Sequence, residues 1–254
     1  MLVVIAIIGI VAAVSVPAIK NMNKADAVAA ATRQLLDDLN RARQLAISQR
    51  TTVYMVFVPS NYWTFPAYSG LPAADRNLGE RLLDKQLIGY NFVTLRNVGD
   101  QPGRNRPKYL EEWRTLPDGI FIPPSKFQVR SVANTVRIVN PVTSQYFDIK
   151  PFDQTDNIPF PAADTLAGNY VNLPYIAFNH LGQVLPSDNE DEEIIPIARG
   201  TAAAAVDPNT KRPVYAPPTL IENPPGNSTN AFSLIVVDRL TGRARVERQQ
   251  ISGN

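Results

Sequence analysis

Few side chains in this sequence are able to do catalytic or metal chemistry. The chain of 254 residues has no cysteine and one histidine, His180. The lack of cysteine excludes a disulfide framework and a thiolate metal site. A single histidine also removes most zinc sites and most Ser-His catalytic sets, and a lone histidine is more often structural than catalytic. We therefore predict no catalytic residue, no metal site and no cofactor, and expect that the protein is not an enzyme.

An acidic run, DNEDEE at residues 188–193, is the strongest candidate for a cation site. Calcium prefers several oxygen ligands, but the spacing here lacks the glycine and the ordered alternation of an EF-hand. A solvated charge run is the interpretation that we favour. Because a proline-dense stretch follows, we expect residues 187–230 to form a long, partly extended surface loop. Its prolines are Pro208, Pro213, Pro217, Pro218, Pro224 and Pro225.

Four arginines gather around a predicted hairpin turn at residues 238–242. They are Arg239, Arg243, Arg245 and Arg248. Exposed guanidinium groups bind phosphate in a bidentate manner, so DNA is a candidate ligand of this hairpin. Against this, Glu247 lies among them, and the formal net charge of the whole chain is only +2. That charge is too small to predict nucleic acid or anionic lipid as a general partner.

An aromatic cluster lies in a proline-bounded loop. It consists of Tyr62, Trp63, Phe65 and Tyr68. Core packing beneath that loop is the interpretation that we favour, and a binding surface is the alternative.

The elements that must position these groups begin with an uncharged segment. Residues 1–19 read MLVVIAIIGIVAAVSVPAI. As a helix this segment is about 28 Å long, close to the ~30 Å hydrocarbon core of a bilayer. A cleaved secretory signal would have a charged region before its apolar core. A buried core helix is the other alternative, but apolar residues on every face of this segment leave no polar side. We therefore predict a transmembrane helix.

Residues 20–50 contain neither glycine nor proline and predict an amphipathic helix that continues the first segment. Apolar side chains recur at spacings of three and four along one stripe. The stripe consists of Ala25, Val28, Thr32, Leu35, Leu39, Ala42 and Ala46. We expect Val28, Leu35, Leu39, Ala42 and Ala46 to pack against the rest of the chain.

From residue 51 to residue 254 the pattern changes to short β-branched and aromatic runs. Hydrophobic residues make up 44% of the chain, which is enough for a core, and 22 prolines and 13 glycines favour a loop-rich β domain. Strands are predicted at 52–58, 88–95, 119–122, 127–132, 135–139, 145–149, 175–179, 232–237 and 243–251, with a weakly predicted helix at 74–87. A helix followed by antiparallel strands predicts an α+β fold, in which a β-sheet head packs on the helix stripe.

The first segment resembles the N-terminal segment of type IV pilins and type II secretion pseudopilins. Residues 2–9 match the family's Leu-Val-Val-Ile-Ala-Ile-Ile-Gly run, and Pro17 falls on the proline that kinks the pilin helix. Gly9 and Pro17 bound the section where a helix is weakest. The resemblance implies that the following residues lie in a membrane or in a filament core: Leu2, Val3, Val4, Ile5, Ile7, Ile8, Gly9, Ile10, Val14 and Pro17.

In that family the processing site, the N-methylated first residue and a glutamate precede the matching run. We expect the sequence as written to start after them. The resemblance further implies a single-pass protein of the bacterial inner membrane whose head is periplasmic or extracellular. Its partners would be other pilin-like subunits, the inner-membrane assembly platform and the lipid bilayer, and its further ligand would be secreted cargo or DNA.

Three further motifs are similar to those of the GspH/FimT branch of minor pilins and pseudopilins. They are Ala42-Arg43-x-x-Ala46-Ile47, Phe178-Asn179-x-x-Gly182 and Thr241-Gly242-Arg243-x-Arg245-Val246. This resemblance implies a minor pseudopilin, with a DNA-binding minor pilin of an uptake pilus as the alternative. A membrane-anchored β domain unrelated to filaments is a further alternative. Residues 60–115 and 186–231 match nothing in the branch and are interpreted as insertions.

Overall fold

The computed structural model describes residues 27–96, 99–101, 106–139, 144–165, 171–185, 192–230 and 233–248. The predicted membrane span at residues 1–19, with Gly9 and Pro17, lies outside these ranges. Within them, no helix combines the length and the apolarity that a membrane crossing requires. The fold is α+β, with antiparallel sheets and an N-terminal helix, as the sequence predicts.

The N-terminal helix covers residues 27–49. Its apolar stripe is the buried face: Leu35, Leu39, Ala42 and Ala46 have no exposed surface, and Val28 is partly buried against the same core. Arg33, Asp37, Asn40 and Gln44 lie on the opposite, exposed face. A period of 3.6 residues produces this division, because side chains three and four apart share a face.

Polar contacts also join the helix to the β-sheet. Asp38, only 3% exposed, accepts hydrogen bonds from Tyr90 Oη at 2.5 Å and from Arg114 Nη1 at 2.6 Å. Gln34 Nε2 donates to Tyr90 Oη at 2.6 Å and to the Thr115 carbonyl at 2.8 Å. Burial is the main reason that the pKa of Asp38 is raised.

Among the described residues, the larger sheet has six strands, in the order β3-β2-β1-β9-β8, with β4 paired to β2. All of its pairings are antiparallel. The strands are β1 (Val53–Phe57), β2 (Gly89–Thr94), β3 (Lys108–Tyr109), β4 (Arg114–Thr115), β8 (Asp153–Thr155) and β9 (Leu173–Phe178).

A second antiparallel sheet has the order β11-β10-β12-β13, with β5 paired to β10, and β6 and β7 form a separate hairpin. The strands are β5 (Ile120–Phe121), β6 (Val136–Val139), β7 (Tyr146–Ile149), β10 (Glu192–Ala203), β11 (Thr219–Glu222), β12 (Ser233–Asp238) and β13 (Ala244–Arg248). A short helix, α4 (Asn227–Asn230), precedes β12.

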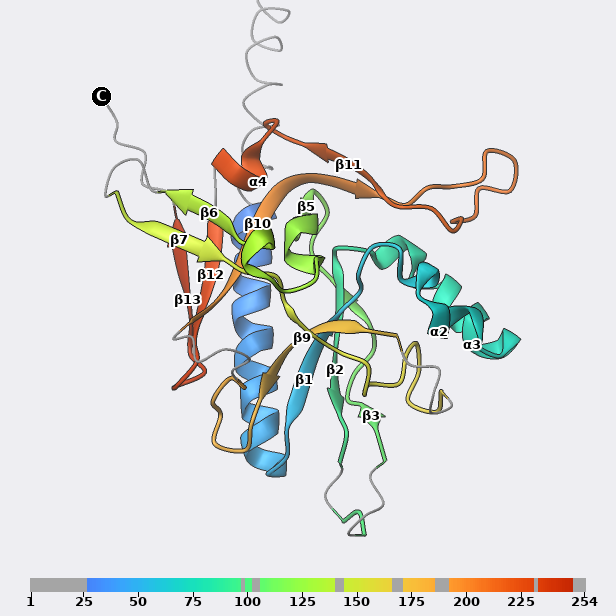
Figure 1. Cartoon of the computed structure of the whole chain (residues 1–254), viewed down its shortest axis with the longest axis horizontal. Coiled ribbons are helices and arrows are strands. Elements are labelled where there is room, and N and C mark those ends of the chain that lie inside the picture. The colour runs from blue at the N-terminus through green and yellow to red at the C-terminus, as the bar shows by residue number, and fades with distance from the viewer. Residues whose placement is uncertain are drawn as a thin grey trace, which may run out of the picture.

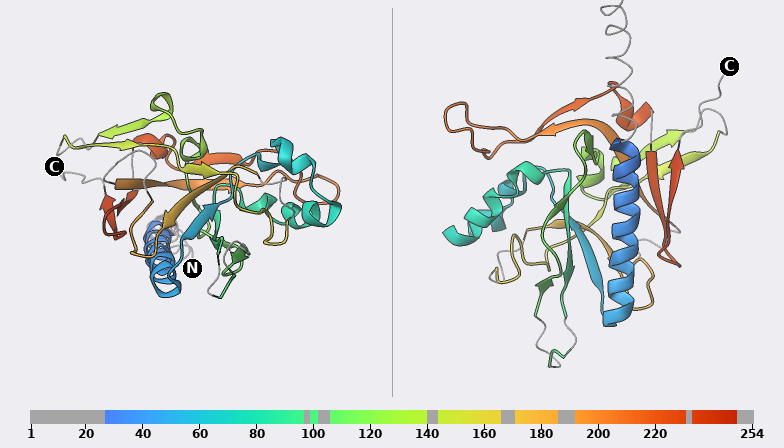
Figure 2. Two further views of the ribbon diagram at one scale, coloured as in Figure 1. Left: turned by 60° about the horizontal axis from the view of Figure 1, so that its bottom comes forward. Right: turned by 180° about the vertical axis from the view of Figure 1, so that it is seen from behind.

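The helix packs against both sheets, and Figure 1 shows it between β12–β13 on one side and β1–β2 on the other. The β6–β7 hairpin covers the other face of β10 and β12, through a cluster that contains Ile138, Phe147, Leu234 and Val236. Figure 2 shows this hairpin and the helix on opposite faces of the molecule. A third hydrophobic cluster covers the other face of the larger sheet. The helices α2 (Pro66–Ser69) and α3 (Ala73–Glu80) lie over this cluster.

The interpretation of residues 187–230 as a surface loop is wrong for much of that segment. The 12-residue strand β10 lies in it, and its Ile195, Ile197 and Ala198 are buried. Pro196 is tolerated because β10 pairs only with β12 over residues 192–197, so one side of the strand makes no ladder there. Strands β5 and β11 pair with β10 from residue 198 onward.

Two smaller predictions also differ from the structure. Residues 127–132 are not a strand, because 3-10 turns occupy Pro124–Phe127 and Val132–Asn134, and Val129 and Val132 are exposed. The Gln154 side chain, rather than a neighbouring strand, donates to the carbonyls of Phe127 and Gln128. The helix expected at 74–87 is shorter: α3 ends at Glu80, and a 3-10 turn follows at Leu83–Lys85.

Candidate functional site

The three motifs of the GspH/FimT resemblance meet at one place in the fold. Arg43, near the end of the helix, donates from Nε to the Thr241 carbonyl at 2.8 Å and to the Gly182 carbonyl at 3.2 Å. A backbone hydrogen bond of 2.9 Å from Val184 N to the Arg239 carbonyl joins the two turns directly. We call Arg43, Gly182, Thr241 and Gly242 the Arg43 junction.

Gly242 brings the two turns of the junction into backbone contact. Its φ is +64°, and a Cβ added there would lie 1.9 Å from the carbonyl oxygen of Gly182. Asp238 holds the turn by accepting hydrogen bonds from Thr241 N at 2.7 Å and from Thr241 Oγ1 at 2.8 Å. The hydrogen bond from the Thr241 hydroxyl is the main reason that the pKa of Asp238 is lowered. The motif residues here hold the backbone of the two turns in close contact.

The structure divides the four arginines that were predicted as a DNA-contacting group. Arg239 is 3% exposed and donates from Nη2 to Glu193 Oε2 at 2.9 Å, so it is not available to a phosphate. Arg245 is exposed but is paired with Glu192 at 2.6 Å and with Glu247 at 3.2 Å. Arg243 is exposed, and the Arg248 side chain lies outside the described structure. Burial therefore removes Arg239 from the four candidate DNA contacts.

Glu193, from the acidic run, is the centre of a buried ionic network. It accepts a hydrogen bond from Lys126 Nζ, and Lys126 also donates to the Lys150 carbonyl at 2.7 Å. Burial is the main cause that lowers the pKa of Lys126. The interpretation of a solvated charge run is wrong at Glu193, which is 5% exposed. Within the described part of the chain, no cluster of three or more histidine or acidic side chains could hold a metal ion.

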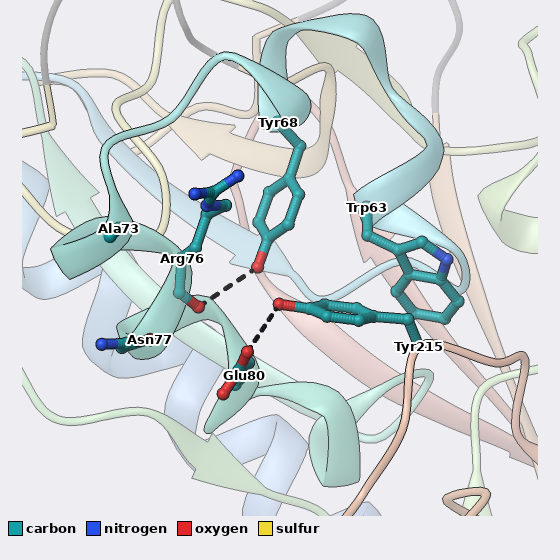
Figure 3. A pocket seen from close by; sticks show the side chains of 7 residues that line it. All are labelled: Trp63, Tyr68, Ala73, Arg76, Asn77, Glu80 and Tyr215. Carbon is teal, nitrogen blue, oxygen red and sulfur yellow. Dashed lines mark hydrogen bonds between the residues drawn. The ribbon is translucent and has the colours of Figure 1, made fainter.

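A cavity lies between residues 63–80 and the loop that contains Tyr215. Residues 66–80 fold as α2 and α3, and the loop between β10 and β11 places Tyr215 against them. We call this cavity, of about 440 Å³, the aromatic pocket (Figure 3). Its walls are Trp63, Tyr68, Ala73, Arg76, Asn77, Glu80 and Tyr215.

One face of α3 forms the polar wall of the aromatic pocket. Ala73, Arg76, Asn77 and Glu80 stand at positions i, i+3, i+4 and i+7, which share one side of a helix. Tyr215 Oη donates to Glu80 Oε1 at 2.9 Å and so joins the loop between β10 and β11 to α3. Figure 3 shows this bond and the hydroxyl of Tyr68 directed at the Arg76 carbonyl.

The aromatic wall is built from rings in edge and tilted contact. The ring of Tyr215 lies 5.9 Å from that of Trp63 and 6.4 Å from that of Tyr68. Tyr68 is buried while Tyr215 is 45% exposed, so the pocket has a rigid floor and an accessible side. Burial is the main cause that raises the pKa of both tyrosines above 10.0, so their phenols stay neutral even in moderately alkaline solution.

The aromatic cluster predicted from sequence is divided between the hydrophobic core and the wall of the pocket. Tyr62 and Tyr68 are buried in the cluster beneath α2 and α3, which is core packing. Trp63 lines the pocket, while Phe65 packs against the cluster and does not line it. Sequence reasoning missed Arg76, Asn77, Glu80 and Tyr215, because only the fold brings Tyr215 to α3. The helical spacing of residues 73, 76, 77 and 80 was the one signal in the sequence that these side chains share a face.

His180 lies apart from the aromatic pocket. It lines an open hollow of about 280 Å³ with Arg50, Thr51, Thr52, Tyr54, Leu95 and Arg96. No pair of a nucleophile and a base forms there with His180 among the hydrogen bonds of the described residues.

Comparison with known proteins gives no further guidance, because no protein-family model, curated protein or solved structure matches this chain.

Proposed function

We propose that the chain is a non-enzymatic subunit of a type II secretion or type IV pilus-like filament, most similar to a GspH/FimT-type minor pseudopilin. The observation that carries the proposal is the division of helix 27–49. One face is buried in the core of the head, and the opposite face is exposed and polar. A subunit needs both faces, because one holds its own head and the other is available to neighbouring subunits.

The Arg43 junction supports the same proposal. The hydrogen bonds of Arg43 fix the end of the helix to two turns of the head, which gives the helix and head one orientation. Motifs similar to those of the pseudopilin branch meet at this point, although they are far apart in the sequence. A filament subunit requires a fixed angle between helix and head, because its lattice repeats that angle in every copy.

In this proposal residues 1–19 hold the subunit in the inner membrane until the assembly platform extrudes it. Helix packing in the filament core then replaces lipid, so extraction exposes little apolar surface to water. The head projects from the filament and offers its insertions to secreted cargo or another ligand.

A membrane experiment tests the first part of the proposal. Ile8→Arg places a charge near the centre of the predicted span, at a cost of about 2.5–3.5 kcal/mol. We expect this variant to be lost from the inner-membrane fraction, whereas the matched Ile8→Val variant should stay. Recovery of the unaltered chain in the soluble fraction would contradict the proposal.

Site-directed crosslinking tests the second part. Because the chain has no cysteine, Arg33→Cys and Asn40→Cys each introduce a single thiol on the exposed face of the helix. With a photoreactive group on that thiol, we expect adducts in intact cells with pilin-like chains or further copies of this chain, identified by mass spectrometry. Arg81→Cys, exposed at the end of α3, is the control. A membrane-bound chain whose helix positions yield no such adducts would instead be an anchored β domain unrelated to filaments.

A further inference from the structure

The aromatic pocket has a preorganised architecture that the filament role does not use. Gly79 lets α3 lie directly on Tyr68, since a Cβ at Gly79 would stand 2.3 Å from the Tyr68 hydroxyl. Beneath it, Tyr62 Oη donates to the Gly79 carbonyl at 2.6 Å. The polar face of α3 and the aromatic floor are therefore held at a fixed separation before any ligand arrives.

The polar groups of the aromatic pocket retain hydrogen-bonding capacity. The guanidinium of Arg76 and the amide of Asn77 are exposed and make no hydrogen bond or ion pair with the described residues. Glu80 accepts one bond, from Tyr215, through Oε1, and no described residue donates to Oε2. Several donors and an acceptor thus lie on α3 in the same cavity as the rings of Trp63 and Tyr215.

We propose that the aromatic pocket binds a neutral saccharide. A pyranose ring has faces of C–H groups, which pack on aromatic rings, and a rim of hydroxyls that both donate and accept hydrogen bonds. Trp63 and Tyr215 supply the rings, and Arg76, Asn77 and Glu80 supply planar hydrogen-bonding groups of both kinds. The volume of about 440 Å³ lies within the range of small-molecule sites, and the exposed side of the pocket admits a chain of sugars.

The charges of the pocket favour this ligand over the other classes that aromatic walls bind. A quaternary ammonium group would gain from the rings and from Glu80, but Arg76 lies in the same wall and repels it. A phosphate would gain from Arg76 but would meet Glu80. The opposite charges of Arg76 and Glu80 balance, and a neutral ligand with many hydroxyls uses both.

The test is a binding assay with the full chain, held in a polyoxyethylene detergent that carries neither a sugar nor a quaternary ammonium headgroup. Neutral tetrasaccharides of glucose in β-1,4 and α-1,4 linkage and of N-acetylglucosamine are the probes, and tetramethylammonium is the competing probe. Calorimetry measures affinity, and saturation-transfer NMR identifies the ring protons that touch the protein. We expect saturable binding of at least one saccharide, with C–H protons of one ring face in contact.

Variants then place the binding in the aromatic pocket. Arg76→Ala removes an exposed donor, and Trp63→Ala removes an aromatic face; each should weaken binding by at least about tenfold, equal to ~1.4 kcal/mol. Arg81→Ala, which removes an arginine that does not line the pocket, should leave the affinity within about twofold. Arg76→Ala keeps the test valid if Trp63→Ala fails to fold, as near-UV circular dichroism would reveal.

Three results would overturn the proposal: no saccharide bound by a natively folded chain, binding of tetramethylammonium in preference to every saccharide, or saccharide affinity unchanged in Arg76→Ala. None of these results bears on the filament role, because the membrane and crosslinking experiments do not use the pocket.

Discussion

The Arg43 junction and the aromatic pocket are both built where distant segments meet, but they are built differently. At the junction, an arginine donates to two backbone carbonyls, and Gly242 lies against Gly182 with no room for a side chain. At the pocket, side chains from residues 63–80 and from the loop between β10 and β11 meet around a cavity, and one exposed hydrogen bond joins Tyr215 to Glu80. The closed contact fixes the orientation of the helix, and the open contact leaves groups available to a ligand.

This difference predicts that substitutions at the junction and in the buried core change stability, whereas substitutions around the pocket change binding. The following predictions test it by unfolding each variant in urea and following tryptophan fluorescence.

The largest effect is expected at Glu193. Glu193→Gln removes the carboxylate that pairs with buried Lys126 and Arg239, and breaking a buried ion pair costs about 3–5 kcal/mol. Its neighbour provides a matched control, because Glu192 forms a partly exposed pair with Arg245. Glu192→Gln should cost at most about 1 kcal/mol. Equal losses in the two variants would mean that the network around Glu193 is not a stabilising part of the scaffold.

Gly242→Ala is expected to have the next largest effect on the free energy of unfolding. The new Cβ would meet the Gly182 carbonyl oxygen, and the positive φ adds its own cost, so we expect a loss of about 3 kcal/mol. Gly99 separates the two causes, because its φ is +94° while nothing lies within 4 Å of its added Cβ. Gly99→Ala should lose only about 1–2 kcal/mol. A loss at Gly242 no larger than that at Gly99 would remove close packing as the reason for this glycine.

Much of the scaffold could be predicted from the sequence, because its signals are local. The stripe from Leu35 to Ala46 has a helical period. Most predicted strands overlap an observed strand, because alternating apolar residues and flanking turn residues mark them in the sequence. Strand β10 was missed because Pro196, Gly200 and its acidic start are typical of a loop, and only the arrangement of β5, β11 and β12 explains why it forms.

The pocket could not be predicted to the same extent, because its walls depend on the tertiary fold. Trp63 and Tyr68 belong to a visible aromatic cluster, but Tyr215 lies 135 positions from Glu80, its hydrogen-bond partner. The burial of Arg239 was missed for a similar reason. Its pairing with Glu193 is set by the β10–β12 register, in which Glu193 lies opposite Val237.

Tyr62 lies beneath the floor of the pocket and Tyr215 lies on its accessible side, so variants of these two tyrosines compare the two regions. Tyr62→Phe removes a buried hydrogen bond to the Gly79 carbonyl and leaves that carbonyl without its partner, at a cost of about 1–2 kcal/mol. Tyr215→Phe removes an exposed bond to Glu80 and should cost about 0.5 kcal/mol or less. For saccharide affinity we expect the reverse order, since Tyr215 touches the cavity and Tyr62 does not. Stability losses that are equal would contradict the division into a rigid floor and an accessible side.

The smallest expected effect is that of pH on the free energy of unfolding. It depends on carboxylates of the scaffold and not on the pocket. The pKa of Asp38 is raised above 3.8, mainly by burial, so the folded chain holds this proton more tightly than the unfolded chain. Its contribution to the free energy of unfolding therefore grows as pH falls through the raised pKa. The pKa of Asp238 is lowered below 3.8, so its contribution is present above that value and is lost as pH falls through the lowered pKa.

Asp38→Asn and Asp238→Asn should thus change the pH dependence of unfolding in opposite directions, which urea titrations at a series of acidic pH values would measure. Deviations of the same sign in both variants would contradict the burial of Asp38 as the cause of its raised pKa. Saccharide affinity should not change between about pH 6 and pH 8, because tyrosine phenols with a pKa of 10.0 are neutral there and burial raises the pKa of Tyr68 and Tyr215 further. Acid would then act on the free energy of unfolding through these scaffold carboxylates, while the aromatic wall of the pocket keeps one protonation state.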